Sequence, residues 1–267
     1  MRDNPFNVLW NNRVLLLDLT KREIESKYKG SLLGKSWILF HHLSLILIYT
    51  FVFSFIMQIK LNTNQGELSG DFSIWLYCGL LPWLSINEAL TSSVHSITTK
   101  TNFVKRIVFP LEILPVMNVL VSFSSLIIGF VLLMVGLIVI GNGLSWTILY
   151  IPLIFIPMFF FMSGLSLLFA GLGVYMRDLG QIVGLLSTLW LYATPILYTF
   201  DMVPVQYQWI FNFNPLTGIV NFYRDVLFWG VSPDFLFIVV FFLIGLLIYL
   251  LGFKVFYKIK KGFADVL

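Results

Sequence analysis

Charged residues are scarce in this chain of 267 residues: they make up 11% of the sequence, whereas a soluble domain has roughly 25%. Apolar residues make up 58% and the mean hydropathy is +0.90, which excludes a soluble enzyme. Cysteine is nearly absent, because Cys78 is the only one, so an internal disulfide is excluded. With three histidines in addition, Cys/His metal clusters are excluded, and we expect no metal and no cofactor bound by this chain.

The sequence also lacks the side-chain sets that catalysis requires. No pair of carboxylates and no Ser/His/Asp set converges at one depth, so we expect no catalytic residue. The segment Gly30 to Ser36 is reminiscent of a phosphate-binding loop, but it has three residues between its glycines where that motif needs four. If ATP powers this protein, another chain hydrolyses it. The net charge of +4 indicates membrane topology rather than a nucleic-acid partner.

Long apolar runs dominate the sequence instead. A bilayer core of about 30 Å needs about 20 helical residues. The sequence predicts an all-α integral membrane protein with six transmembrane helices, at residues 36–59, 72–97, 114–140, 146–172, 179–200 and 235–256. The charge-free run in the middle of the chain is too long for one crossing, and the turn signal Gly141-Asn142-Gly143 divides it.

The basic residues indicate the orientation of these helices. All of them except Lys60 and Arg224 lie before the first span, between the second and third, between the fourth and fifth, or in the last turn of the sixth and beyond it. Basic residues concentrate in cytoplasmic loops. We therefore expect those segments to be cytoplasmic, together with both termini, because six is an even number of crossings.

Residues 1–35 predict a cytoplasmic amphipathic interface helix ahead of the transmembrane domain of residues 36–267. Trp10, Val14, Leu17, Lys21, Ile24 and Tyr28 recur at helical spacing and form a stripe that is apolar except at Lys21. A helix of this kind lies on the membrane surface with its stripe towards the lipid. Two interpretations stay open: the helix is a topology anchor, or it is a surface that a partner moves.

The segment 201–234 is too long for a plain connection and too aromatic for a solvated one. Pro204, Pro215 and Pro233 cut it into short pieces, and tryptophan and tyrosine prefer the membrane boundary. We expect two short re-entrant half-helices here, between the fifth and sixth spans, that form an outer gate. A passive amphipathic flap is the alternative.

Glu88 is the only acidic residue well inside a predicted span. A carboxylate at the centre of a bilayer costs roughly 2.5–3.5 kcal/mol on insertion scales, so it should face the bundle interior or a wet cavity. Four roles stay open: a packing hydrogen bond, a residue at a helix end near the interface, a channel group, or a proton relay.

Polar residues also recur along one face of the fifth predicted span, among them Gln181, Thr188 and Tyr192. Such a face is best buried in protein or water, so it either packs against a helix or lines a path. Aromatic rings on it would offer stacking surfaces to sugar rings. This hypothesis concerns Tyr49, Trp190, Tyr192 and Tyr198.

Several segments, spread in order over nearly the whole chain, resemble the membrane permeases of ABC-2 polysaccharide exporters, which carry O-antigen, capsule or teichoic-acid chains. The first runs from Leu19 to Gly34 and continues with Trp37 and the run 49–53. The others are 103–115, 175–183, 194–198, 214–217 and 223–224. His41-His42 departs from the pattern, because relatives often carry a proline-containing pair there.

The resemblance implies a homodimer of six-helix subunits joined to two ABC ATPase subunits, which bind ATP and Mg. Its cargo would be a lipid-linked polysaccharide, O-antigen rather than capsule or teichoic acid, crossing the inner membrane during lipopolysaccharide biosynthesis. Coupling to the ATPase would involve Arg22, Glu23, Tyr28, Lys29, Lys105, Arg106 and Glu112. The channel would be lined by Tyr49, Glu88, Gln181, Thr188, Trp190, Tyr192 and Tyr198. The outer gate would contain Trp209, Phe211, Asn214, Pro215, Tyr223 and Arg224.

Three other functions remain open from the sequence. Within the same family, the cargo could be a drug or a small lipid. An ion-coupled secondary transporter or channel would work without an ATPase and would require Glu88, but the sequence offers few other buried ionisable groups. A membrane enzyme acting on lipid-linked sugars would need a catalytic pair, and none is evident.

Overall fold

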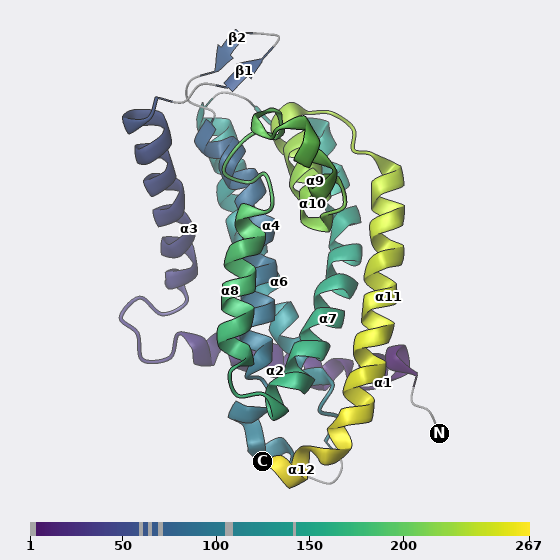
Figure 1. The fold of residues 1–267 in the computed structure, drawn as a ribbon. Coiled ribbons are helices and arrows are strands. Elements are labelled where there is room, and N and C mark those ends of the chain that lie inside the picture. The colour runs from purple at the N-terminus through teal and green to yellow at the C-terminus, as the bar shows by residue number, and fades with distance from the viewer. Residues whose placement is uncertain (1–3, 59–60, 64–65, 69–71, 105–108, 141–142) are drawn as a thin grey trace.

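The computed structural model describes residues 4–58, 61–63, 66–68, 72–104, 109–140 and 143–267. It is a helical bundle with one small antiparallel hairpin, in which β1 (Leu61–Thr63) pairs with β2 (Gly66–Leu68). Figure 1 shows α1 (Pro5–Asn11), α2 (Arg13–Lys27) and α12 (Phe263–Val266) at one end, which we call the basal end. The hairpin, α9 (Gln208–Asn212) and α10 (Pro215–Arg224) lie at the opposite end.

Four helical segments among the described residues are long and apolar enough to cross a membrane. The first is Ser36–Ile56, where α3 (Ser36–Tyr49) continues as a π-helix over Thr50–Ile56. The second is Ile113–Val139, within α6 (Ile113–Ile140). The third is Trp146–Tyr175, made of a 3-10 turn and α7 (Ile151–Tyr175). The fourth is Phe235–Val266, which comprises α11 (Phe235–Ile259), a 3-10 turn and α12.

Two further helices lie beside these spans in the bundle. α4 (Phe72–Val94) is buried along most of its length and packs against α6 and α7, which makes it the central helix. α8 (Leu179–Tyr192) is an apolar helix of 14 residues, so it ends well before the expected boundary at residue 200. Pro195 explains this end, because proline cannot continue a helix and disfavours helical conformation in the residue before it.

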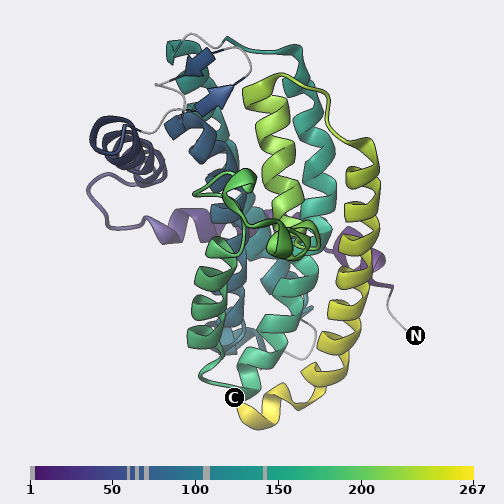
Figure 2. The same cartoon turned by 45° about the horizontal axis from the view of Figure 1, so that its top comes forward.

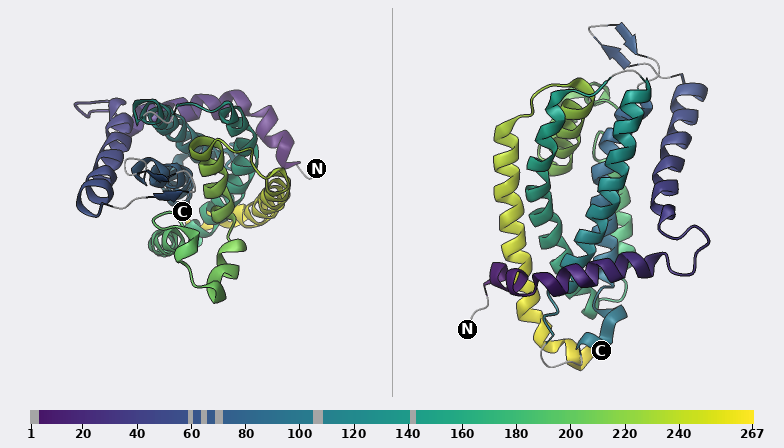
Figure 3. Two further views of the ribbon diagram at one scale, coloured as in Figure 1. Left: turned by 90° about the horizontal axis from the view of Figure 1, so that it is seen from above. Right: turned by 180° about the vertical axis from the view of Figure 1, so that it is seen from behind.

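The N-terminal segment forms a transverse element made of α1 and α2. Figure 3 shows α1 and α2 running crosswise along one side of the bundle, near its basal end. Leu16 of α2 is buried in a cluster with Ile113, Val116 and Met117 of α6. The face of α2 that packs on the bundle is therefore not the predicted stripe, of which Trp10, Val14 and Leu17 stay exposed on the isolated chain.

α3 stands apart from the other spans, as Figures 1 and 3 show. Only 11% of its apolar window is buried, against 56% for the α7 segment. His42 makes its main polar attachment: one ring nitrogen lies 2.8 Å from the Tyr77 hydroxyl of α4, and the other lies 3.1 Å from the Ser125 carbonyl oxygen of α6. The loose packing leaves the α4 side of α3 accessible.

The segment between α8 and α11 forms short helices, as the prolines indicate. Besides α9 and α10, it contains 3-10 turns at Phe200–Met202 and Val205–Tyr207 and a π-helical turn at Asp225–Trp229. Figure 2 shows α9 and α10 brought forward at the end of the bundle opposite α2. α10 buries one face, which includes Leu216, Ile219 and Val220, and it contacts α4.

α7 and α11 pack with backbones in direct contact. A Cβ at Gly252 of α11 would lie 2.2 Å from the Gly164 carbonyl oxygen, and a Cβ at Gly164 would lie 2.5 Å from the backbone of Ile248. Small residues allow such close approach of membrane helices. This pair of glycines therefore fixes the distance between the two helices.

We predict that Gly252→Ala destabilises the bundle although alanine is the better helix former. The added methyl group would force the helices apart, at a cost of about 1–3 kcal/mol. Gly184→Ala is the matched control, because no atom lies within 4 Å of a Cβ there. It should be neutral or stabilising by up to about 1 kcal/mol. The melting temperature of the purified protein in detergent measures both changes, and equal melting temperatures for the two variants would contradict this packing role.

Candidate functional site

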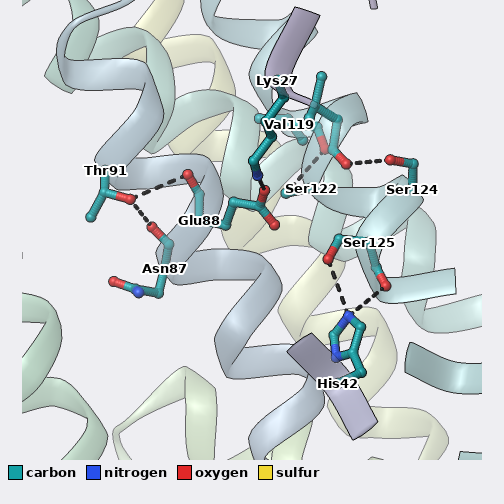
Figure 4. Close-up of polar contacts among 10 residues, drawn as sticks. Lys27, His42, Asn87, Glu88, Thr91, Val119, Ser122, Ser124 and Ser125 are labelled. Carbon is teal, nitrogen blue, oxygen red and sulfur yellow. Dashed lines mark hydrogen bonds and ion pairs between the residues drawn. The ribbon is translucent and has the colours of Figure 1, made fainter. Parts of the chain in front are cut away.

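Two ion pairs connect the transverse helix α2 to α4 and to the turn that follows it. The Lys27 ammonium binds the Glu88 carboxylate of α4, as Figure 4 shows. One helical turn earlier, Glu23 accepts a hydrogen bond of 2.7 Å from Lys100, which lies in the 3-10 turn before α5 (Thr101–Val104). α2 is thus attached at two points to the central helix and its extension.

The pair of Lys27 and Glu88 is partly accessible to solvent, with side-chain exposures of 45% and 22%. Burial alone would lower the pKa of Lys27, but the charge of Glu88 and the hydrogen bond to it outweigh burial and raise that pKa. The contribution of Lys27 to the stability of the folded state is therefore fully present below the ordinary lysine pKa. It is lost only as the pH rises through the raised pKa. Partly exposed pairs contribute about 0.2–1 kcal/mol, so this pair matters more for positioning than for stability.

The structure thus places Glu88 at the α2 junction, near the basal end, where it is half-buried and paired. The carboxylate borders two cavities on either side of the pair. One of about 260 Å³ is lined by residues that include Ser92, Ser96 and Asn118. The other, of about 650 Å³, lies between α3 and α4 and is lined by residues that include Trp37, Trp83 and Asn87.

The remaining residues expected to couple to a partner fall into three groups. Arg22 and Lys29 are exposed, whereas Tyr28 is half-buried, and this burial raises its pKa. Glu112 is buried just before α6, where its carboxylate binds Lys260 at the end of α11. Lys105 and Arg106 lie outside the described residues.

The residues expected to line a channel do not all share one face. Gln181, Thr188 and Tyr192 are exposed on α8, and Tyr49 of α3 is half-buried. Trp190 turns inwards instead: its indole nitrogen donates to Asn214 over 2.9 Å, and its ring packs against Phe161. Tyr198 lies beyond the helix, where its hydroxyl donates to the Tyr192 carbonyl oxygen over 2.7 Å.

Asn214 holds the broken end of α8 against the start of α10. Its amide nitrogen donates to the Ala193 carbonyl oxygen over 3.0 Å and to the Thr194 hydroxyl over 2.9 Å. Its carbonyl oxygen accepts from the Leu216 backbone and so caps α10, where Pro215 takes the first helical position. One side chain thus joins the end of one helix to the beginning of another.

Arg224, at the end of α10, is buried with 4% of its surface exposed. Its guanidinium donates to the carbonyl oxygens of Pro195 over 2.7 Å and Ile196 over 2.8 Å, and it lies 3.3 Å from the centroid of the Trp75 ring of α4. The break after α8 leaves these carbonyl groups without helical partners, and an apolar interior cannot leave them unpaired. Arg224 therefore connects α10, α4 and the broken end of α8.

The other residues expected in the outer gate differ in exposure. Trp209 is exposed, and Phe211 is half-buried with an edge-to-face contact to Tyr198. Tyr223 is fully buried in the main core cluster. Apart from the residues already named, sequence reasoning missed Trp75 of α4, since a tryptophan within a long apolar run gives no separate signal.

The described residues contain no group of three or more His, Cys, Asp or Glu side chains that could hold a metal ion. Cys78 is buried close to Arg224: a Cβ at the adjacent Gly79 would lie 3.0 Å from the guanidinium. The accessibility of this single thiol to a labelling reagent can therefore show whether the packing around Arg224 is intact.

We predict that Arg224→Met opens this region, because it leaves the Pro195 and Ile196 carbonyl oxygens unpaired. Each unpaired buried group costs about 1–3 kcal/mol. The rate at which a maleimide labels Cys78 should rise at least tenfold. Arg224→Lys should fall between wild type and Arg224→Met, because an ammonium cannot reproduce the planar fork.

Arg177→Met is the matched control for this measurement, because Arg177 is exposed between α7 and α8. Its labelling rate should equal that of wild type. Unchanged labelling in Arg224→Met would show that the guanidinium does not hold this region closed.

The family model of the ABC-2 type transporter matches residues 15–228. An O-antigen export system permease protein RfbA of Klebsiella pneumoniae is 31% identical over 255 residues, which are 95% of each chain. A second protein of that name from the same organism is 30% identical over the same shares. A protein of that name from Myxococcus xanthus is 25% identical over 228 residues, 85% of each chain. With a family match over most of its length and a multi-pass helical bundle, the chain belongs to the ABC-2 type transporter family.

Proposed function

We propose that this protein is the permease subunit of an ABC transporter that exports O-antigen as a lipid-linked polysaccharide across the bacterial inner membrane. The observation that carries the proposal is the similarity to O-antigen export permeases over 95% of the chain. In this proposal α3, α4, α6, α7, α8 and α11 each cross the bilayer, and both termini are cytoplasmic. The functional unit is a homodimer with two ABC ATPase subunits, which bind ATP and Mg.

The basal end is the proposed coupling surface. α2 lies across it, carries the exposed Arg22, and is joined to α4 by Lys27 and Glu88. A partner that pushes on α2 would therefore move α4. ATP binding can shift the bundle between two conformations only if the ATPase binds one of them more tightly than the other. Because α2 is attached by weak ion pairs, it can take different positions in the two conformations and so offer the ATPase different contacts.

α4 also extends from the coupling surface to the proposed outer gate. Glu88 contacts α2, and Trp75 contacts Arg224 of α10. These two residues are 13 positions apart on one helix, a distance of about 20 Å. A shift of α4 would reach α10 and the broken end of α8 together, which supports the proposal that residues 201–234 form a gate.

The proposed glycan path lies along the exposed polar face of α8 and the facing surface of α3. Exposed Gln181, Thr188 and Tyr192 would be poorly matched to lipid, so a water-filled path or the second subunit is a better environment. Tyr49 and Tyr198 are half-buried close to this face and offer rings for stacking. Trp190, which packs inwards, is proposed to shape the path rather than to touch the glycan.

We predict that deletion of the gene removes O-antigen from the cell surface and causes lipid-linked O-antigen to accumulate inside. Fluorescent antibody labelling of intact cells and a gel of extracted glycolipid measure the two effects. The gene supplied on a plasmid should restore both. Genes for an ATPase and for glycosyltransferases beside this gene would support the assignment. Surface O-antigen that persists in the deletion strain would contradict it.

We predict that Glu88→Gln and Lys27→Gln each lower ATP-dependent export by up to about fivefold, as expected for the loss of a pair worth about 0.2–1 kcal/mol. The charge-swapped variant Lys27→Glu with Glu88→Lys should recover most of the activity. Glu25→Gln, which removes the exposed pair of Glu25 and Lys35, is the control. It should leave export unchanged.

The charge swap also separates the proposal from an ion-coupled transporter. If Glu88 binds a proton or cation, its carboxylate is needed at position 88, and the swapped variant should be inactive. Export in vesicles that lack the ATPase would equally favour the ion-coupled alternative.

A further inference from the structure

A groove of about 550 Å³ lies between the beginning of α1 and the last turns of α11. Asn4 and Pro5 form one wall of it. Its floor is apolar and consists of residues that include Leu250, Phe253 and Tyr257. The beginning of α1 and the last turns of α11, which border the groove, lie at the opposite end of the transverse element from the end of α2, as Figure 3 shows. The Lys27 and Glu88 junction and the proposed glycan path share no residue with the groove.

Three exposed lysines border this groove: Lys254, Lys258 and Lys261. Within the described parts of the chain, none of the three has a carboxylate partner. Lys260 differs, because it binds the buried Glu112 and lies 4.3 Å from the Tyr257 ring centroid. The groove therefore presents unneutralised positive charge above an apolar floor.

The same side of α11 changes from apolar to basic at one level. Leu243, Leu247 and Leu250 are exposed and recur at helical spacing. Lys254 and Lys258 continue that spacing at i+4 steps, so they lie on the same stripe. A phospholipid whose acyl chain lies against the leucines would have its headgroup beside the lysines. The change from leucine to lysine along α11 is thus the pattern expected where the hydrocarbon layer of a membrane meets the headgroup layer.

We propose that this groove binds an anionic phospholipid, with the phosphate held by Lys254, Lys258 and Lys261 and an acyl chain over Leu250 and Phe253. Basic pockets at the headgroup level of membrane helices bind anionic lipids, and each lysine near such a surface contributes about a factor of five in affinity. A soluble anion would use the lysines but not the apolar floor. A zwitterionic lipid would use the floor but would not neutralise the lysines.

The bound lipid would also hold α1 in place. The Tyr249 hydroxyl donates to the Pro5 carbonyl oxygen over 3.4 Å, and Phe6 packs against Phe160 and Tyr249. These contacts attach the beginning of α1 to α7 and α11 beside the groove. The lipid is thus an additional tie between the transverse element and the last span, whatever cargo the protein exports.

The test is native mass spectrometry of the detergent-purified protein, with its ATPase subunits where they copurify, titrated with dioleoyl phosphatidylglycerol or dioleoyl phosphatidylcholine. Wild type should prefer phosphatidylglycerol. The variant Lys254→Gln with Lys258→Gln should lose this preference by about 25-fold, from the product of two lysine contributions. Lys21→Gln with Lys35→Gln removes the same charge from exposed positions of the basal end and should keep the preference.

Two further arms identify what the groove holds. Leu250→Trp fills the groove at an exposed position and keeps every lysine, so it should weaken phosphatidylglycerol binding at least fivefold. Glycerol 3-phosphate, which has no acyl chain, should not compete with the lipid. The proposal is overturned if glycerol 3-phosphate competes equally, or if the control variant loses as much selectivity. It is also overturned if the lysine variant sheds its ATPase subunits while lipid selectivity stays unchanged.

Discussion

Every peptide carbonyl group inside an apolar bundle must find a hydrogen-bond donor, and the break after α8 creates several that lack one. Pro195 prevents the helix from continuing. Arg224 and Asn214 supply the missing donors, the first to Pro195 and Ile196 and the second to Ala193. Both side chains come from the two ends of α10. The position of this short helix, and hence the shape of the end opposite α2, follows from the need to satisfy that break.

At the basal end, ion pairs rather than hydrogen bonds to broken-helix carbonyl groups join the elements. Two of its ion pairs are partly exposed and contribute little to stability, whereas the third joins Lys260 to the buried Glu112; all three fix which residues face each other. Lys27 and Glu88, Glu23 and Lys100, and Glu112 and Lys260 each join elements that are distant in sequence. Weak connections of this kind can open at a small free-energy cost, whereas the glycine contacts hold α7 and α11 at a fixed distance.

The site residues show how far sequence reasoning reaches. The helical N-terminal segment and the short helices of the segment 201–234 are signalled by local patterns, whereas the fifth span was predicted to reach residue 200 and ends at Tyr192, before Pro195. The partners of Glu88 and Arg224 are not, because Lys27 is 61 positions and Trp75 is 149 positions away. The hypothesis of aromatic stacking surfaces placed Trp190 among the channel candidates, but in the structure its indole nitrogen donates inwards to Asn214. A single-helix pattern contains no information about such partners.

By itself, the sequence determined that this is a membrane protein with mainly apolar helices, because hydropathy and the spacing of charges are local properties that lipid enforces directly. Family membership was also evident from motifs in order along the chain. Only the tertiary structure decided that Glu88 belongs to a junction with α2, and that Arg224 is a buried tie rather than a loop charge. It also showed that the lysines at the end of α11 and in the turn after it divide between Glu112, which binds Lys260, and an open groove. The reason is that each of these depends on which helix faces are brought together by packing, and packing is set by the whole bundle.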